Sequence, residues 1–147
     1  MSDAQHMARA LALASAMQGR TGDNPAVGCV IVKDDAVISE GATAQGGRPH
    51  AEEVALLHAG AEARGATAYV TLEPCAERSS GAASCTDLLI AAGVARAVIA
   101  TGDPHPLAAG AGLVRLRDAG ITVELGLMEE PARRLNAAFL GKWEQGA

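Results

Sequence analysis

Residues 68–75 read AYVTLEPC in one-letter code, and this stretch decides how the chain is expected to fold. Ala68 to Leu72 form a short apolar run of the kind found in buried strands. The segment Glu73-Pro74-Cys75 follows directly, so the end of the strand delivers a thiol. We therefore expect a core strand with a reactive side chain at its end.

Helices are expected on both sides of this strand. Upstream, a helix begins near His50 and runs toward Gly60, with Glu52 close to its start. Downstream, Cys85 leads into an apolar helix that ends at Gly93. We expect the histidine and both cysteines in first helical turns, because free N–H groups and the positive end of the helix dipole stabilise a thiolate there.

The remaining segments continue the alternation of helices and strands. Helices are predicted over residues 3–17 and 113–119 and from 129, and strands over 27–32, 37–39, 98–100 and 121–125. A polar turn at 33–35 joins the first two strands as a hairpin. This order predicts the α/β class, as a three-layer α/β/α sandwich with helices on both faces of a central sheet. At 147 residues, one domain over 1–147 is expected.

Charge and composition exclude several classes of function. The formal net charge is −5, and Lys and Arg are scattered, which argues against a nucleic-acid footprint. No apolar stretch is long enough to cross a bilayer, and the first residues lack a secretion signal. The odd total of three cysteines fits a reducing compartment. These features predict a cytoplasmic protein that binds neither membrane nor nucleic acid and acts on a small molecule.

His50, Cys75 and Cys85 together indicate a catalytic zinc site. One imidazole and two thiolates are three ligands, and a three-ligand zinc site leaves a coordination position open for chemistry. Glu52, outside the ligand set, is placed to shuttle protons, and H-x-E with a later Pro-Cys is the outline of zinc deaminases. A single His or Cys is more often a packed core residue, and Cys29 is expected to be one. The ordered set predicts hydrolytic removal of an amino group.

Residues around the predicted metal are candidates for binding the aminated ring. They are Ala51 and Pro74, which flank the ligands, and Asn24 in the turn before Pro25. Asn24 is equally well explained as a turn former.

The chain resembles the pyrimidine deaminase domain of the bifunctional riboflavin-biosynthesis deaminase/reductase family, within the cytidine deaminase-like superfamily. Matching segments cover nearly the whole chain: residues 7–11, 24–32, 49–52, 65–75 and 89–94. The resemblance implies a five-stranded mixed sheet and a homodimer or homotetramer. It also implies His50, Cys75 and Cys85 as zinc ligands, Glu52 as proton shuttle and Asn24 as a substrate contact.

The departures from the family pattern fall in the expected substrate loops. Residues 76–84 read AERSSGAAS, where the family usually carries Ser-His, a Gly, a basic residue and Thr-Pro-Pro. A family histidine is replaced by threonine, and the family's Asp-Pro-Asn-Pro has His as its third residue here. No reductase domain is expected in 1–147. The candidate contacts in or near these loops are Thr43, Arg48, Glu77, Arg78, Asp103 and His105.

These departures leave the substrate open. The chain is predicted to be a zinc-dependent deaminase similar to the riboflavin-pathway diaminohydroxyphosphoribosylaminopyrimidine deaminase, with altered substrate loops. Losing cationic partners for a sugar phosphate favours an unphosphorylated purine, pyrimidine or triazine base or nucleoside. A nucleic-acid deaminase and a zinc-binding module without catalysis are further alternatives. The nine residues between the cysteines, where nucleic-acid deaminases have two, and the presence of Glu52 argue against them.

Overall fold

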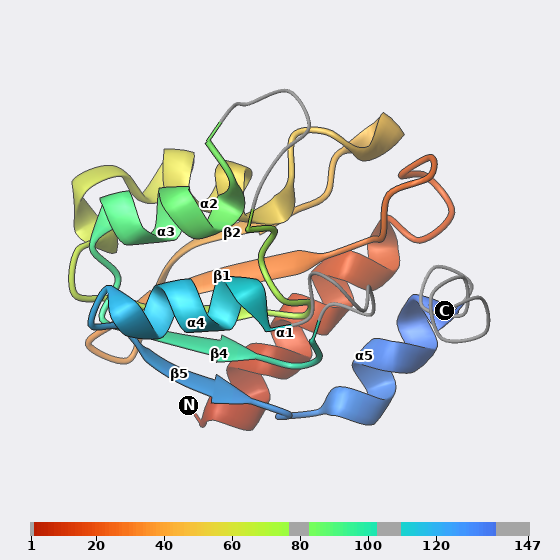
Figure 1. Ribbon diagram of the computed structural model, residues 1–147. Helices are drawn as coiled ribbons and strands as arrows, with labels where there is room; N and C mark the ends of the chain where they lie inside the picture. The colour runs from red at the N-terminus through yellow and green to blue at the C-terminus, as the bar shows by residue number, and fades with distance from the viewer. Residues whose placement is uncertain (1, 77–82, 103–109, 138–147) are drawn as a thin grey trace.

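A five-stranded mixed sheet forms the centre of the molecule in the computed structural model, which describes residues 2–76, 83–102 and 110–137 (Figure 1). The strand order is β2-β1-β3-β4-β5. The strand β1 pairs antiparallel with β2 and β3, whereas β3, β4 and β5 run parallel. The strands are β1 (Gly28–Lys33), β2 (Ala36–Ala42), β3 (Thr67–Val70), β4 (Arg96–Ile99) and β5 (Thr122–Leu125).

Helices cover both faces of the sheet, which confirms the predicted three-layer sandwich (Figure 1). On one face lie α1 (Asp3–Ala16) and α5 (Glu129–Leu135). On the other lie α2 (Ala51–Ala59), α3 (Cys85–Ala92) and α4 (Ala111–Asp118), together with the short 3-10 helix η2 (Gly60–Ala63). A second 3-10 helix, η1 (Gln45–Gly47), precedes α2. Helices α3 and α4 are the crossovers that parallel strands require.

The hairpin predicted at 33–35 is present. Asp34 and Asp35 have φ of 51° and 64°, and two consecutive positive φ values match the right-handed twist of the flanking strands. Strand β2 is longer than expected because it pairs with β1 along its whole length, from Lys33↔Ala36 to Gly28↔Ala42. Strand β3 ends two residues earlier than expected.

Each face of the sheet has its own apolar core. The larger core joins the sheet to α2, α3 and α4, and includes Ala55, Leu89 and Leu116. The smaller core joins it to α1 and α5 through Met7 and Ala132. Alternation along β3 serves both, because Ala68 and Val70 point to the larger core and Tyr69 to the smaller one.

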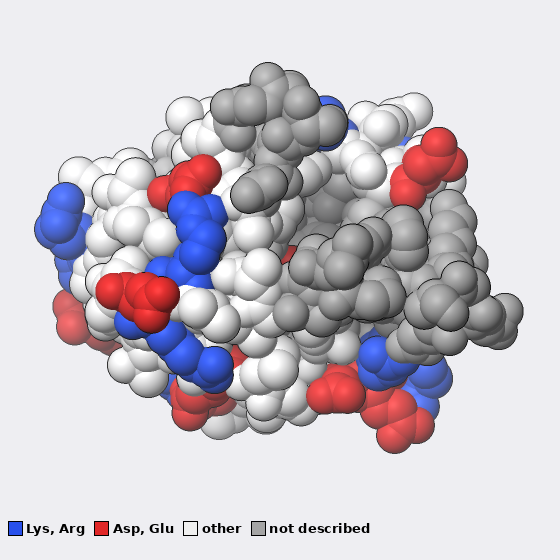
Figure 2. Space-filling model, viewed as in Figure 1, with Lys and Arg blue, Asp and Glu red and all other residues white. Residues whose placement is uncertain are grey.

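The surface seen in Figure 2 carries side chains of both charges. Lys and Arg lie beside Asp and Glu on this face and do not form a continuous basic area. Among the helices that the structure describes, none is long and apolar enough to cross a membrane.

Candidate zinc centre

Helix α2 lies unusually close to strand β2, and this approach sets the position of His50 and Glu52. A Cβ added at Gly41 would lie 2.4 Å from the carbonyl oxygen of Ala51, so only glycine fits there. The Ser39 hydroxyl donates a hydrogen bond to the carbonyl oxygen of Ala55 (2.7 Å). His50 is the N-cap of α2, as expected, and its backbone N–H donates to Glu53 Oε1 (3.1 Å). The ligand side chain therefore sits on a fixed helix start.

Cys85 is the first residue of α3, and this helix start is also well capped. Ser84 is the N-cap, and its hydroxyl accepts from the Asp87 N–H (3.1 Å). Asp87 Oδ2 in turn accepts from the Ser84 N–H (3.1 Å), which completes a capping box. A helix start with both partners satisfied holds Cys85 in one orientation.

Cys75 follows strand β3, as the sequence indicated, but the expectation that it lies in a first helical turn is wrong. Residues 73–75 have no regular secondary structure. Backbone hydrogen bonds to α3 hold the thiol instead: the Cys85 N–H points at Cys75 Sγ (3.2 Å), and the Thr86 N–H donates to the Cys75 carbonyl oxygen (3.1 Å). Cys75 therefore receives the N–H groups of a helix start without belonging to the helix.

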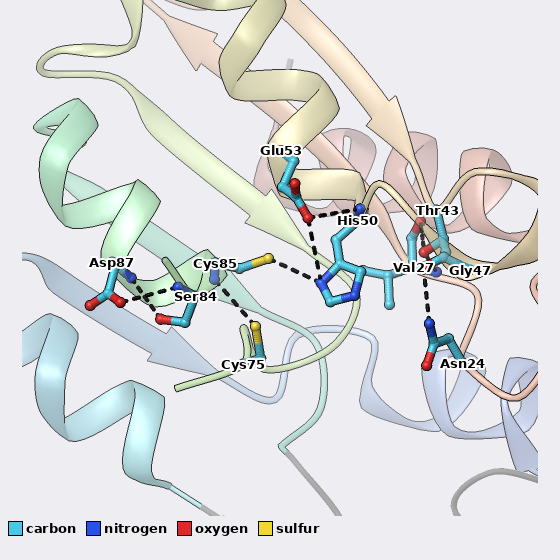
Figure 3. A network of polar contacts seen from close by, with 10 residues as sticks. All are labelled: Asn24, Val27, Thr43, Gly47, His50, Glu53, Cys75, Ser84, Cys85 and Asp87. Carbon is cyan, nitrogen blue, oxygen red and sulfur yellow. Dashed lines mark hydrogen bonds and ion pairs between the residues drawn. The ribbon is translucent and has the colours of Figure 1, made fainter. Parts of the chain in front are cut away.

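The three predicted ligands converge (Figure 3). His50 Nδ1 lies 3.3 Å from Cys85 Sγ, and the ligand atoms of His50, Cys75 and Cys85 all lie within 4.8 Å of one another. Two thiolates and an imidazole form a donor set that suits zinc, and three protein ligands leave the fourth position open. This cluster is the one of its kind found among the described residues.

The electrostatics of the site favour a thiolate beside a protonatable carboxyl group. Hydrogen bonds from Cys85 and His50 hold the pKa of the Cys75 thiol well below its usual range. Burial raises the pKa of Glu52 to about 7, and the nearby charge of Cys75 acts in the same direction. A carboxyl group with its pKa near neutrality is suited to both taking up and giving back a proton.

A cavity of about 160 Å³ opens at two of the three ligands, His50 and Cys75. Glu52 reaches it from α2, although this residue is only 4% exposed. Asn24 and Pro25 form part of the wall, and the Asn24 amide group is fixed by a hydrogen bond to the Gly47 carbonyl oxygen (3.0 Å; Figure 3). The lining residues are Asn24, Pro25, Val27, Thr43, His50, Glu52, Leu72, Glu73 and Cys75.

The other predicted contacts are placed differently. Thr43 lines the cavity, and its hydroxyl accepts from the Val27 N–H (3.0 Å). Arg48 is exposed, and Ala51 and Pro74 are buried; none of these three is among the lining residues. The substrate contacts predicted at Glu77, Arg78, Asp103 and His105 lie outside the described residues.

Glu73 is a residue of the site that was not among the predicted contacts. It lines the cavity and is 5% exposed. Oε1 accepts from the Gly110 N–H and Oε2 from the Gly112 N–H, both at 3.1 Å, so the carboxylate joins the Cys75 segment to the start of α4. An acidic residue directly after a buried strand was the available signal.

Comparison with known proteins agrees with this geometry. The model of the family described as the cytidine and deoxycytidylate deaminase zinc-binding region matches residues 1–101. The chain belongs to this family. His50, Cys75 and Cys85 are accordingly the zinc-binding triad of the chain, and the zinc prediction is confirmed.

Relatives of the chain come from riboflavin biosynthesis, which confirms the resemblance inferred from the motifs. The riboflavin biosynthesis protein RibD of Escherichia coli is 52% identical over 146 residues, covering 99% of this chain and 40% of that protein. The diaminohydroxyphosphoribosylamino-pyrimidine deaminase of Buchnera aphidicola is 40% identical and is matched over 99% of both chains. The solved structure of Acinetobacter baumannii RibD (form 2) superimposes with a TM-score of 0.94 at 48% identity, over 98% of this chain and 40% of that one.

Proposed function

We propose that this chain hydrolytically deaminates the diaminohydroxyphosphoribosylaminopyrimidine of riboflavin biosynthesis. The observation that carries the proposal is a buried carboxyl group, Glu52, in a cavity that two ligands of the three-ligand zinc set, His50 and Cys75, also line. A purely structural zinc site has four protein ligands and no use for such a group. The substrate is suggested by the Buchnera aphidicola protein, which the chain matches from end to end.

The roles of the chain's own residues follow from their places in the cavity. Zinc, when bound by the triad, supplies a Lewis acid that activates water at neutral pH. Glu52 would take up one proton from that water and deliver it to the ring nitrogen next to the reacting carbon. It would then take the second proton from the hydroxyl group added to that carbon and pass it to the departing amine. Asn24, held by Gly47, and the walls at Val27 and Leu72 orient the flat ring and exclude bulk water. The net reaction replaces an amino group by oxygen and releases ammonia.

The sequence of residues 76–84 favours a second candidate, an unphosphorylated aminated ring. This stretch lacks the family's usual residues between the two cysteines. A phosphate without cationic partners binds weakly. The two candidates differ in whether the ribosyl phosphate is needed for turnover.

The test is ammonia release by zinc-loaded protein with the ribosyl phosphate, its dephosphorylated form, cytosine, cytidine, guanine and aminotriazines. Turnover of the ribosyl phosphate, with a much higher KM after dephosphorylation, is the expected result. Turnover confined to unphosphorylated rings would replace the ribosyl phosphate with the second candidate substrate. Failure of every compound would overturn the proposed activity.

The variant Glu52→Gln tests the assigned proton shuttle. We expect kcat to fall by about 10³-fold, because the amide cannot transfer the proton, with zinc content and unfolding temperature unchanged. Glu62→Gln, which removes an exposed carboxylate of η2, serves as the control. Substantial turnover by the Glu52→Gln protein would remove Glu52 from the mechanism.

The cytoplasmic location and the homodimer or homotetramer stay predictions of this proposal. Light scattering on the zinc-loaded protein measures the oligomeric state directly, and a monomer at working concentrations would contradict it.

A further inference from the structure

Helix α4 carries none of the three ligands but contacts the chain on both sides of Cys75. Before the ligand, the Glu73 carboxylate accepts the Gly110 and Gly112 N–H groups. The packing here is tight, because a Cβ at Gly112 would lie 2.6 Å from the Pro74 carbonyl oxygen.

After the ligand, the contact comes from Arg115 in the last turn of α4. Its Nη1 donates a hydrogen bond to the carbonyl oxygen of Ala76 (2.7 Å), the residue that follows Cys75. This bond and those of Glu73 fix the segment that carries the thiol from both ends.

The same guanidinium also reaches the segment of the other thiolate. Arg115 Nη2 forms an ion pair with Asp87 Oδ1, and Asp87 is the third residue of α3, which begins at Cys85. Asp87 keeps its other oxygen for the Ser84 N–H. Two nitrogens of one planar group thus join the segment after Cys75 to the first turn that holds Cys85.

We propose that Arg115 is a positioning residue for the zinc site, which sets the separation of the Cys75 and Cys85 thiolates before the metal binds. A fork of two donors in one plane can hold two segments at a fixed distance, and the single ammonium of lysine cannot reach both in that geometry. Ligands that are already in place lose less freedom when zinc binds, so the affinity for zinc is higher. The inference rests on the zinc site and is independent of which ring is deaminated.

The experiment compares zinc affinity in Arg115→Gln, Arg115→Lys and Arg117→Gln, measured by competition with a chromogenic chelator in the absence of substrate. Arg117 lies two residues further along α4 and is exposed, so its variant removes the same charge from the same helix end. The thiolate-to-metal charge-transfer bands of the cobalt(II)-loaded proteins report whether both sulfurs still bind.

We expect the Kd for zinc to rise about tenfold in Arg115→Gln, at the lower end of the range for groups that support metal ligands, with weaker charge-transfer bands. Arg115→Lys is expected to lose affinity as well, and Arg117→Gln to bind like the wild type. If Arg115→Gln fails to fold, the zinc affinity of Arg115→Lys tests the proposal instead. Wild-type affinity in Arg115→Lys, or equal losses in Arg115→Gln and Arg117→Gln, would overturn the proposal.

Discussion

Two histidines lie on opposite faces of the sheet, and the two rings have different surroundings: His50 is partly exposed, whereas His6 is buried. His50, at the start of α2, has its Nδ1 3.3 Å from the sulfur of Cys85 and lies at the cavity. His6, inside α1, is 1% exposed and packs on the Tyr69 ring at a centroid distance of 5.0 Å. Neither nitrogen of His6 has a hydrogen-bond partner among the described residues, although Asp35 Oδ1 is 4.0 Å away.

Position in the fold, and not residue type, therefore decides what these groups do. On the α2 face the titratable groups stand at helix starts and at the end of a strand, where backbone N–H groups and thiolates meet. On the α1 face none of the three metal ligands is near, and Asp3, although it is the first residue of α1, is held in side-chain pairs: the Tyr69 hydroxyl donates to Asp3 Oδ1 (2.6 Å), and Arg96 Nη2 donates to Asp3 Oδ2 (2.6 Å). We expect the first face to govern zinc and turnover and the second to govern stability alone.

Zinc removal is expected to give the largest difference between the two faces of the sheet. With free zinc at about 1,000 times its Kd, the metal stabilises the fold by about 4 kcal/mol, so a chelator should abolish turnover and lower the unfolding temperature. Hydrogen exchange should quicken most at the first turns of α2 and α3, and less along α1.

His50→Ala is the control for that measurement. Because the variant lacks one ligand, the chelator should have little further effect on its unfolding temperature. Equal loss of hydrogen-exchange protection on both faces would mean that the metal supports the whole fold. The two faces would then not differ in their dependence on zinc.

A matched pair of glycines gives the next largest effect. A Cβ at Gly28 would lie 1.9 Å from the Ala10 carbonyl oxygen on the α1 face, and one at Gly41 would lie 2.4 Å from that of Ala51 on the α2 face. Each Gly→Ala change is expected to destabilise the metal-free protein by about 2–3 kcal/mol in denaturant unfolding, because backbone atoms must move.

Only Gly41→Ala should also weaken zinc binding, since Ala51 follows the ligand His50 on the displaced helix. The Gly28→Ala protein is the control for Gly41→Ala, because it introduces a similar steric clash on the opposite face of the sheet. A comparable loss of zinc affinity in both variants would show that the faces are coupled.

The smallest effect is a pH dependence on the α1 face. The hydrogen bond from Arg96, with a second from Tyr69, lowers the pKa of Asp3 to about 2. A lowered carboxyl pKa stabilises the fold above the unfolded pKa, and this contribution is lost as the pH falls through about 2. Because the Asp3 side chain is 43% exposed, we expect only about 0.5 kcal/mol from the pair.

Asp3→Asn should therefore be less stable than the wild type at pH 7 by about this amount, with the gap closing as the pH falls from about 4 toward 2. Urea unfolding at several pH values measures it, with the exposed Glu62→Gln as control. A gap that does not change with pH would assign the effect to packing.

The sequence was sufficient for the architecture and the metal ligands because both depend on local patterns. The apolar run before Pro74, the polar turn at 33–35 and the glycine at 93 each act through nearby backbone geometry. The zinc ligands carry donor chemistry that is visible in single letters. The substrate contacts around Asn24 and Thr43 stay predictions, because nothing in the structure tests a bound ring.

What could not be predicted depends on contacts between segments distant in sequence. The Cys75 segment is fixed by N–H groups of α3 and by Glu73 and Arg115 across to α4. An arginine in an amphipathic helix looks like a solvated charge until its neighbours in space are known. The first-helical-turn position predicted for Cys75 was wrong for the same reason, since N–H groups of α3 supply the contacts that a helix start of its own was expected to provide.

The order in which the triad is assembled has a consequence for folding. His50 follows the β1–β2 hairpin, whereas Cys75 and Cys85 belong to the parallel part of the sheet. The pairing of β1 with β3 brings the two parts together, and such non-local pairing is slow. Complete coordination must therefore come late, after the chain has found its topology. A refolding experiment started with and without zinc should show the same early phase, with the metal slowing only the unfolding of the finished protein.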